Sequence, residues 1–515
     1  MQKNSFLFVI LSSLTIFVWF FFLAPKEQHK VLQSNNTMQS QVGTSVETIN
    51  KDSSLIKGTT ESYVEEEKIN IENEIYKAVL TNKGAGVLSW SVKEKDGQWV
   101  DLIFEGSQPV MANFPGSIYK VVSKSDSKIV FEYTSKEGWK ITKTYNLDKN
   151  YMHNLNISVE KTRQDAIVPQ IDLSWGPGLG TDLKEQKENI SLTRALAYTL
   201  DKPYKLKKLK NEIELATDYK WAAIDNRYFL AAFIPENSKD FDKIIPSRLD
   251  KKYPVGLSLE ATFPKDLTKK EYFINFYLGP KGYTYLKSYN LGLEKTVDFG
   301  FFGFLGKIAF AVLTFFYGLT NNYGWAIIMI TIVIQILVFP LTLKSLKSTA
   351  AMKRVQPFIK EIQAKYKDNP QRLQSEMISI YRTQKVNPLG GCLPMLLQLP
   401  IFWAFFTMLR NAYELRSASW ILWVKDLSAA DHFMMIGVFC IHLLPLIMGF
   451  GMFLQQKMTA VTSDPTQKKI MYIMPILFTF MFWSFPSGLV IYWITNSAIS
   501  MIEQYFVLKK AESYV

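Results

Sequence analysis

Cysteine and histidine are scarce in this chain of 515 residues, which has 2 cysteines and 4 histidines. Cys392 and Cys440 lie in apolar runs without the spacing of a metal or redox motif, so neither a disulfide framework nor a bound metal is expected. The patterns H-E-x-x-H, G-x-x-x-x-G-K-[ST] and G-x-S-x-G do not occur. These absences disfavour a disulfide-stapled secreted protein, an ATP-driven pump and a serine hydrolase.

Positive charge is concentrated in the apolar part of the chain. The formal net charge is +13, and residues 299–515 hold 19 basic and 9 acidic residues, whereas residues 1–298 hold 40 and 37. A chain of this length has room for three or four units at roughly 100–200 residues per domain. The composition therefore predicts an apolar, basic C-terminal part and a more balanced N-terminal part.

Long uncharged runs predict six membrane spans. Residues 6–24 are 19 consecutive uncharged residues, enough helix to cross a hydrocarbon core of about 30 Å. We interpret residues 1–25 as an uncleaved transmembrane anchor, because a signal peptide has a shorter apolar stretch of about 7–15 residues. The remaining five spans are predicted at residues 325–343, 386–409, 433–455, 470–485 and 488–508.

Charge in the short loops predicts the orientation of these spans. The loop 344–385 has ten basic residues against three acidic ones, which favours the cytoplasm, and the loop 457–469 is also basic. Both termini then lie in the cytoplasm and the large N-terminal domain lies outside, provided that the apolar segment 299–322 does not cross. We expect that segment to be an amphipathic helix in the outer interface.

The segment between the first two spans is predicted to be a linker followed by an all-β domain. Residues 26–71 begin with a stretch rich in Ser, Thr, Gln and Asn, typical of a flexible linker. Residues 72–298 contain short alternating stretches, such as 128–134 and 139–145, which predict antiparallel strands in a sandwich. A sugar-binding site remains open, since aromatic residues are plentiful there.

The basic loop 344–385 is predicted to form a helical hairpin. Apolar residues at helical spacing flank a turn in which Asn369 is a candidate N-cap and Pro370 the first helical residue. Two interpretations of the basic residues stay open, namely retention in the cytoplasm with contact to anionic lipid, and a docking surface for ribosomal RNA, a nascent chain or a targeting partner. The candidate docking residues are Lys353, Arg354, Lys360, Lys365, Lys367 and Arg372.

Polar side chains recur inside the predicted spans. Thr331 and Gln335 lie four residues apart, Gln398 lies between two prolines, and Tyr492 and Asn496 lie in the last span. Hydrogen bonds between packed helices would account for each of them singly. Together, and without a relay of charged residues, they indicate a mildly polar cavity rather than a path for protons or ions.

Several stretches resemble the YidC family of membrane protein insertases. They are NPLGGC (387–392) with QLPIF (398–402), YGW (323–325) with FPLT (339–342), SDPTQKKIM (463–471), FPSGLVIYW (485–493), and, in the exported domain, WGPG (175–178) and NRYFLAAFIP (226–235). The resemblance implies a membrane protein with an α-helical bundle of six transmembrane helices. Five of these form an insertase core over 323–510 around a hydrophilic groove, with an all-β supersandwich in the periplasm and a cytoplasmic coiled-coil hairpin.

The resemblance also implies particular site residues. Trp493 joins the groove residues Thr331, Gln335, Gln398, Tyr492 and Asn496, and Asp464 joins the cytoplasmic docking residues. The family commonly has an arginine at the position of Gln335. The glutamine therefore weakens any mechanism in which a fixed charge attracts acidic residues of the substrate, although it still donates hydrogen bonds.

The implied function is that of an insertase and chaperone in the bacterial inner membrane. It binds hydrophobic segments of nascent membrane proteins and releases them into the bilayer, alone or with the Sec translocon, without a cofactor or covalent catalysis. The ribosome, the signal recognition particle receptor and anionic lipid are further implied partners. A secondary transporter would need inverted repeats and ionisable coupling residues, and a sugar-modifying enzyme would need paired carboxylates in the exported domain; both stay open as alternatives.

Overall fold

The computed structural model describes most of the chain from residue 66 onward. The described residues are 66–104, 107–180, 191–199, 205–208, 213–214, 219–247, 255–384, 386, 393–437, 439–459 and 465–512. All of them belong to one compact unit, Tyr63–Val515. The predicted anchor at 1–25 lies outside the described residues, as does the predicted linker up to residue 65. The first strand begins at Lys68, so the predicted start of the β domain at residue 72 is too late.

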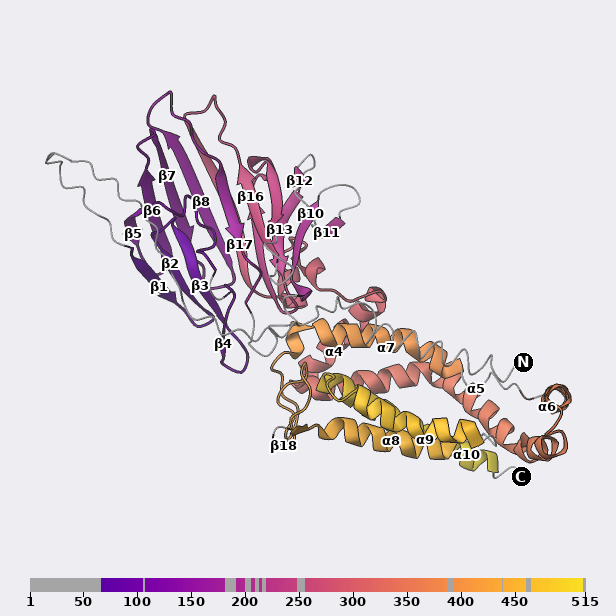
Figure 1. The fold of residues 1–515 in the computed structure, drawn as a ribbon. Helices are drawn as coiled ribbons and strands as arrows, with labels where there is room; N and C mark the ends of the chain where they lie inside the picture. Colours follow the sequence, from indigo (N-terminus) through magenta and orange to yellow (C-terminus); the bar gives the residue numbers. More distant parts are fainter. Residues whose placement is uncertain are drawn as a thin grey trace, which may run out of the picture. The chain divides into compact units, whose positions relative to one another are not determined.

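Antiparallel strands build the β domain, as the sequence predicts (Figure 1). The nine-stranded sheet has the order β11 (Lys205–Lys208), β10 (Arg194–Thr199), β13 (Tyr219–Asp225), β14 (Phe229–Pro235), β17 (Lys269–Pro280), β8 (Met152–Lys161), β7 (Trp139–Asn146), β6 (Lys128–Thr134) and β5 (Lys120–Lys124). One four-stranded sheet consists of β1 (Lys68–Glu72), β2 (Tyr76–Thr81), β3 (Gly86–Lys93) and β4 (Trp99–Asp101). The other consists of β12 (Ile213–Glu214), β15 (Lys243–Ser247), β16 (Gly256–Ala261) and β9 (Ile171–Trp175). Short helices in and after this domain are η3 (Ser238–Asp240), α3 (Tyr283–Ser288) and η4 (Leu293–Thr296).

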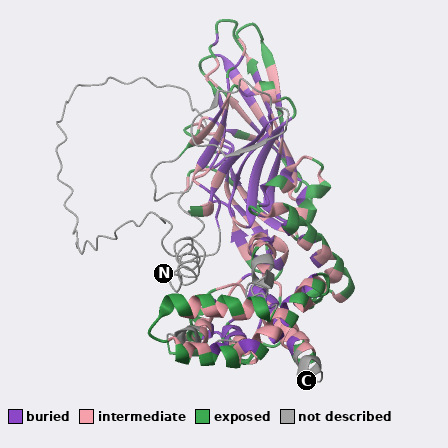
Figure 2. Ribbon diagram, turned by 90° about the vertical axis from the view of Figure 1, so that its right-hand side faces the viewer, coloured by how far each residue is buried: buried purple, intermediate pink, exposed green. Residues whose placement is uncertain are grey.

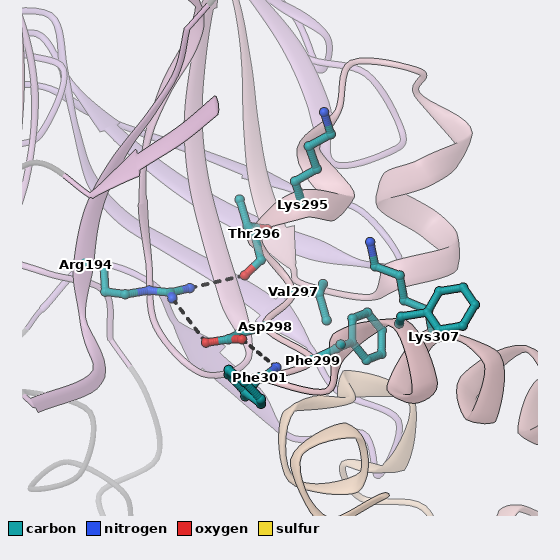
Figure 3. A pocket seen from close by; sticks show the side chains of 11 residues that line it. Arg194, Lys295, Thr296, Val297, Asp298, Phe299, Phe301 and Lys307 are labelled. Carbon is teal, nitrogen blue, oxygen red and sulfur yellow. Dashed lines mark hydrogen bonds and ion pairs between the residues drawn. The ribbon is translucent and has the colours of Figure 1, made fainter. Parts of the chain in front are cut away.

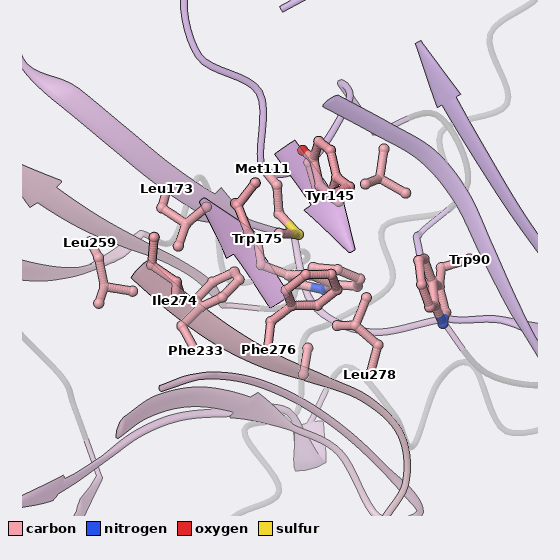
Figure 4. Packing of buried hydrophobic residues seen from close by; sticks show 14 of the residues in the cluster. Trp90, Met111, Tyr145, Leu173, Trp175, Phe233, Leu259, Ile274, Phe276 and Leu278 are labelled. Atoms are coloured by element: carbon pink, nitrogen blue, oxygen red, sulfur yellow. The ribbon is translucent and has the colours of Figure 1, made fainter. Parts of the chain in front are cut away.

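One hydrophobic core joins both small sheets to the large one. Strand β7 alternates between buried and half-buried positions along its whole length, which is the period of a strand with one face in the core. In Figure 4, Trp175 of β9 lies close to Phe233 and Phe276 of the large sheet, and the ring centroid of Trp90 of β3 lies 6.3 Å from that of Phe276. Because a strand presents alternate residues to one face, the alternating pattern of β7 places one row of its side chains in this core.

Lys143 is the exception in the inward row of β7. Its side chain is fully buried, and Nζ donates hydrogen bonds to the carbonyl oxygens of Ala85 at 2.9 Å and Met111 at 2.5 Å. The hydroxyl of Tyr145 donates to the same Ala85 oxygen at 2.8 Å. Burial lowers the pKa of the Lys143 ammonium from 10.5 to about 7, and the nearby carboxylate of Asp172 opposes this shift in part.

This lysine makes the stability of the chain depend on pH. Between about pH 7 and the ordinary lysine pKa, the unfolded chain binds one proton more than the folded chain, so the free energy of unfolding rises with pH. We expect Lys143→Met to remove a slope of up to about 1.4 kcal/mol per pH unit from urea unfolding in micelles between about pH 7.5 and 9.5. The same change at exposed Lys128 should keep the wild-type slope, and equal slopes in wild type and Lys143→Met would refute the assignment.

Seven helices follow the β domain in the described part of the chain. They are α4 (Gly303–Thr320), α5 (Tyr323–Lys365), α6 (Pro370–Thr383), α7 (Leu393–Asn411), α8 (Leu443–Thr459), α9 (Pro465–Met481) and α10 (Ser487–Glu512). The short helix η5 (Tyr413–Leu415) follows α7. Among the described residues, α4 and α5 are long and apolar enough to cross a membrane, by length and composition alone.

The helices expose many large apolar side chains, whereas the β domain buries most of its own (Figure 2). Nearly all exposed large apolar residues of the described chain lie after residue 300, for example Leu337 of α5 at 74% and Phe480 of α9 at 71%. Soluble proteins rarely expose apolar surface of this extent, whereas lipid tails accept it. The helical part therefore has the surface of a membrane protein.

Helix α5 corrects the predicted boundary between the second span and the hairpin. The span 325–343 and the first arm of the hairpin are one 43-residue helix that continues through Pro340 and Pro357. It begins because the side chain of Asn322 accepts hydrogen bonds from the backbone N–H groups of Gly324 and Trp325. The predicted N-cap of the second arm, Asn369, is confirmed, since its side chain accepts from the N–H of Arg372 at 3.1 Å.

The predicted span 433–455 begins too early. The strands β18 (Met434–Ile436) and β19 (Phe439–Ile441) form a hairpin, and α8 begins only at Leu443. The carboxylate of Asp431 accepts hydrogen bonds from the N–H groups of Leu443 at 2.8 Å and Leu444 at 3.1 Å. This cap from a residue outside the helix determines that α8 begins at Leu443. The length of an apolar run does not predict that position.

A buried ion pair joins the β domain to the segment after α7. Nε of Arg416 lies 2.5 Å from a carboxylate oxygen of Glu94, and both side chains are almost fully buried. The guanidinium also lies 4.6 Å from the ring centroid of Tyr228. Nearby, Nζ of Lys95 donates to the carbonyl oxygen of Glu414 at 2.6 Å. The segment after α7 is therefore held to the β domain by charge as well as by packing.

The ion pair predicts a large effect from a small change. Glu94→Gln keeps the size of the side chain but removes the charge that faces Arg416, so we expect a loss of about 3–5 kcal/mol in the free energy of unfolding. Urea unfolding of the full chain in micelles, followed by tryptophan fluorescence, measures this loss. Glu74→Gln, at an exposed position of the same domain, is the matched control. A loss no larger than that of the control would contradict the role of the pair.

Candidate functional site

Polar side chains from three helices meet at Asn496 of α10. Its Oδ1 accepts hydrogen bonds from Nε2 of Gln335 on α5 and, at 3.4 Å, from Nε2 of Gln398 on α7. Nε2 of Gln335 also lies 3.5 Å from Oγ of Ser500. One side-chain amide on α10 is therefore shared by two glutamines that are distant in the sequence.

Tyr492 completes this cluster one turn before Asn496. Its hydroxyl accepts a hydrogen bond from Nε2 of Gln398 at 2.6 Å, and its ring lies 4.6 Å from that of Phe405. We call Gln335, Gln398, Tyr492, Asn496 and Ser500 the polar network. Its members are buried or half-buried, so each hydrogen bond replaces one that water would otherwise supply.

Two of the candidate groove residues lie outside the polar network. Thr331 is fully buried, and its hydroxyl donates to the carbonyl oxygen of Ile327 in its own helix at 2.6 Å. Trp493 points into an aromatic cluster, with ring centroids 5.2 Å from Phe402 and 5.4 Å from Phe482. Both contacts are typical of helix packing.

The candidate docking residues of the hairpin are mostly on its surface. Arg354, Lys360, Lys365, Lys367 and Arg372 are exposed. Lys353 is half-buried, and its Nζ donates to the carbonyl oxygen of Met458 at the end of α8 at 2.7 Å. Asp464 lies outside the described residues. Lys353 therefore has a packing contact that its place in a basic loop does not suggest.

Sequence reasoning recognised the polar residues of the spans but not their common partner. Asn496 and Ser500 lie four apart on α10, which places them on one face, and this spacing is the signal for a shared partner. Which helix supplies that partner depends on the packing of α5 and α7 against α10. The role of Arg416 was also missed, because its partner Glu94 lies more than 300 residues earlier.

Comparison with known proteins identifies the family. Residues 100–312 match the family described as YidC periplasmic domain, and residues 315–513 match the family described as 60Kd inner membrane protein. A protein from Endomicrobium trichonymphae named membrane protein insertase YidC is 71% identical over 516 residues, which cover 99% of this chain and 98% of that relative. The chain belongs to the YidC family.

More distant members agree along most of the chain. A YidC relative from Syntrophus aciditrophicus is 35% identical and covers 87% of this chain and 86% of its own length. A solved structure of an active YidC insertase covers 85% of this chain and 92% of its own, with 20% identity and a TM-score of 0.39. The two family matches and the two sequence relatives confirm the resemblance drawn from the sequence. This YidC-family chain is an inner membrane protein with a β-rich periplasmic domain and a helical membrane region.

The shared amide predicts which polar residue matters most for helix packing. Replacing Asn496 by Ala removes the acceptor that both glutamine amides share, which leaves Gln398 its bond to Tyr492 and Gln335 its longer contact with Ser500. We therefore expect a loss of about 1–2 kcal/mol in the stability of the micellar protein. Thr495→Ala is the matched control, because the Thr495 hydroxyl donates only to Ile491 of its own helix in the described structure. Thermal unfolding measures both losses, and equal losses would mean that the network adds no stability.

Proposed function

We propose that this chain inserts nascent membrane proteins into the bacterial inner membrane by binding their hydrophilic segments at the polar network. The observation that carries the proposal is the sharing of one asparagine amide by Gln335 and Gln398. An incoming polar segment can accept a hydrogen bond from one glutamine while the other glutamine stays bound to Asn496. When the segment leaves, the released glutamine can bind Asn496 again, so no donor stays unpaired. The groove residues in this proposal are Thr331, Gln335, Gln398, Tyr492, Trp493 and Asn496.

The energetics favour such a route over an intact bilayer. A charged side chain at the bilayer centre costs about 3 kcal/mol or far more, depending on the scale. Amide groups within the membrane region supply hydrogen bonds along part of that path, and burial of the apolar segment of the substrate in lipid supplies the driving force. Binding and solvation suffice for this cycle, so neither a cofactor nor covalent catalysis is part of it.

Gln335 gives this member of the family a neutral donor. A glutamine amide donates two hydrogen bonds and carries no charge, so it can bind a carboxylate, a hydroxyl or a backbone carbonyl alike. Selection of substrates in this chain then depends on hydrogen-bond acceptors rather than on acidic residues.

The hairpin formed by α6 and the end of α5 is proposed as the cytoplasmic docking surface. The exposed Lys360, Lys365, Lys367 and Arg372 carry charge that suits ribosomal RNA, a receptor of the signal recognition particle, or anionic lipid. Lys353, Arg354 and Asp464 complete the proposed surface. The Sec translocon is a further proposed partner.

This mechanism requires a particular arrangement in the membrane. It includes six spans, both termini in the cytoplasm, the segment 299–322 in the outer interface, and a five-span core over 323–510. The basic loop 344–385 supports this orientation, because short basic loops are retained in the cytoplasm.

Insertion assays with two substrates test the polar network. The full chain is reconstituted in liposomes, and protease protection is scored for a small membrane protein with a short polar tail and for a purely apolar one. We expect Gln335→Leu to slow insertion of the polar-tailed substrate by about tenfold, which corresponds to one lost hydrogen bond of about 1.4 kcal/mol, with little effect on the apolar substrate.

The matched control is Thr342→Val, two turns later on α5, because the Thr342 hydroxyl donates to the carbonyl oxygen of Val338 in its own helix. Equal slowing of both substrates by Gln335→Leu would count against the network as the binding site. Protection no better than that of empty liposomes, with the wild-type chain, would contradict autonomous insertion.

A further inference from the structure

A cavity of about 520 Å³ lies where the β domain leads into α4. It is lined by Arg194 on β10, by residues 295–301, and by Gly303, Phe304 and Lys307 at the start of α4 (Figure 3). This place is far from the polar network in the sequence, and the insertion mechanism does not use it. Its wall combines cationic groups with exposed phenylalanine rings.

The carboxylate in the cavity wall, Asp298, and the second carboxylate that Arg194 contacts, Asp225, are already balanced by cations. Arg194 contacts Asp225 through two of its nitrogens, at 2.9 and 2.5 Å, and Nζ of Lys281 lies 3.0 Å from the same carboxylate. Asp298 lies 3.8 Å from the Arg194 guanidinium and accepts a hydrogen bond from the N–H of Gly300. Two cations thus offset two carboxylates.

Two lysines remain as surplus positive charge. Lys295 and Lys307 are both exposed, and no carboxylate of the described residues lies within 4.0 Å of either amino group. Among the described residues, Nζ of Lys295 contacts a neutral group, the hydroxyl and ring of Tyr198. In Figure 3 both amino groups point away from the Arg194–Asp298 pair. The cavity mouth therefore favours an anion.

An apolar face of α4 continues from this mouth. Phe301 and Phe304 are 89% and 77% exposed, and the row continues along the helix through Ile308, Phe315 and Leu319. The opposite face is buried through Gly306, Phe310 and Leu313. A small water-soluble anion would leave this apolar row exposed to water, whereas the acyl chains of a lipid cover it.

We propose that this cavity binds the phosphate headgroup of an anionic phospholipid, with Lys295 and Lys307 contacting the phosphate and Phe304 and the row on α4 contacting the acyl chains. Charge complementarity and the adjoining apolar row both select this ligand over a soluble one. The bound lipid would fasten the junction between the β domain and α4 to the membrane surface. This inference does not depend on the insertase function.

Lipid retention by the full chain tests the proposal. Native mass spectrometry of the protein released from detergent, titrated with phosphatidylglycerol, gives the affinity for the first bound lipid. We expect Lys295→Gln with Lys307→Gln to weaken it roughly 10- to 30-fold, because each lysine near a membrane surface contributes roughly a three- to fivefold factor. Lys307→Gln alone should weaken it about three- to fivefold, and this exposed position leaves the fold intact.

The matched control is Lys120→Gln with Lys128→Gln, two exposed lysines on β5 and β6 of the β domain, which should change the affinity less than twofold. Phe301→Ser with Phe304→Ser should weaken phosphatidylglycerol binding but leave binding of glycerol phosphate unchanged. Two results would overturn the proposal: equal affinity in the Lys295/Lys307 variant and the control, or equal retention of phosphatidylcholine.

Discussion

A polar group in hydrocarbon has to find its hydrogen-bond partner within the protein, and the helical part of this chain depends on that constraint. Hydrocarbon holds no water that could bind such a group, so leaving an amide unpaired there costs several kcal/mol. Gln335, Gln398 and Asn496 meet this requirement only when α5, α7 and α10 pack in the observed arrangement. The same contacts that hold the helices together therefore also create the polar surface on which the proposed function depends.

The constraint explains why the polar network can be stable and still bind a substrate. Asn496 accepts from two donors, so one of them can be released while the other stays bound. A network with a single donor for each acceptor would lose its only bond on binding a substrate. The neutral Gln335 fits this reading, because an uncharged donor can be left paired to another amide when no substrate is present.

Charge plays a different part outside the membrane. The buried pair of Arg416 and Glu94 joins elements that lie 322 residues apart in the sequence. Such a pair is costly to desolvate and costly to break, which favours one docking geometry over others. At the cavity near α4, by contrast, Lys295 and Lys307 have no acidic partner among the described residues. Paired charge thus fixes the structure, and surplus charge is left for a ligand.

Local signals in the sequence predicted the local features of the fold. The alternation in β7 and the cap at Asn369 with Pro370 depend on near neighbours, and both are confirmed. Predictions that assumed uniform apolar runs were less accurate. The hairpin at β18 and β19 interrupts such a run, because its limit is set by Asp431 through a contact with the start of α8.

The sequence alone determined the family, the β-rich domain, the helical membrane region and the polar residue types of the candidate site. These follow from motifs, periodicity and charge, which are properties of short stretches. Only the tertiary structure decided that Asn496 is the shared acceptor, that Trp493 packs among aromatic rings, and that Arg416 pairs with Glu94. Each of these is a contact between distant segments, and its geometry is set by how whole elements pack rather than by any local pattern.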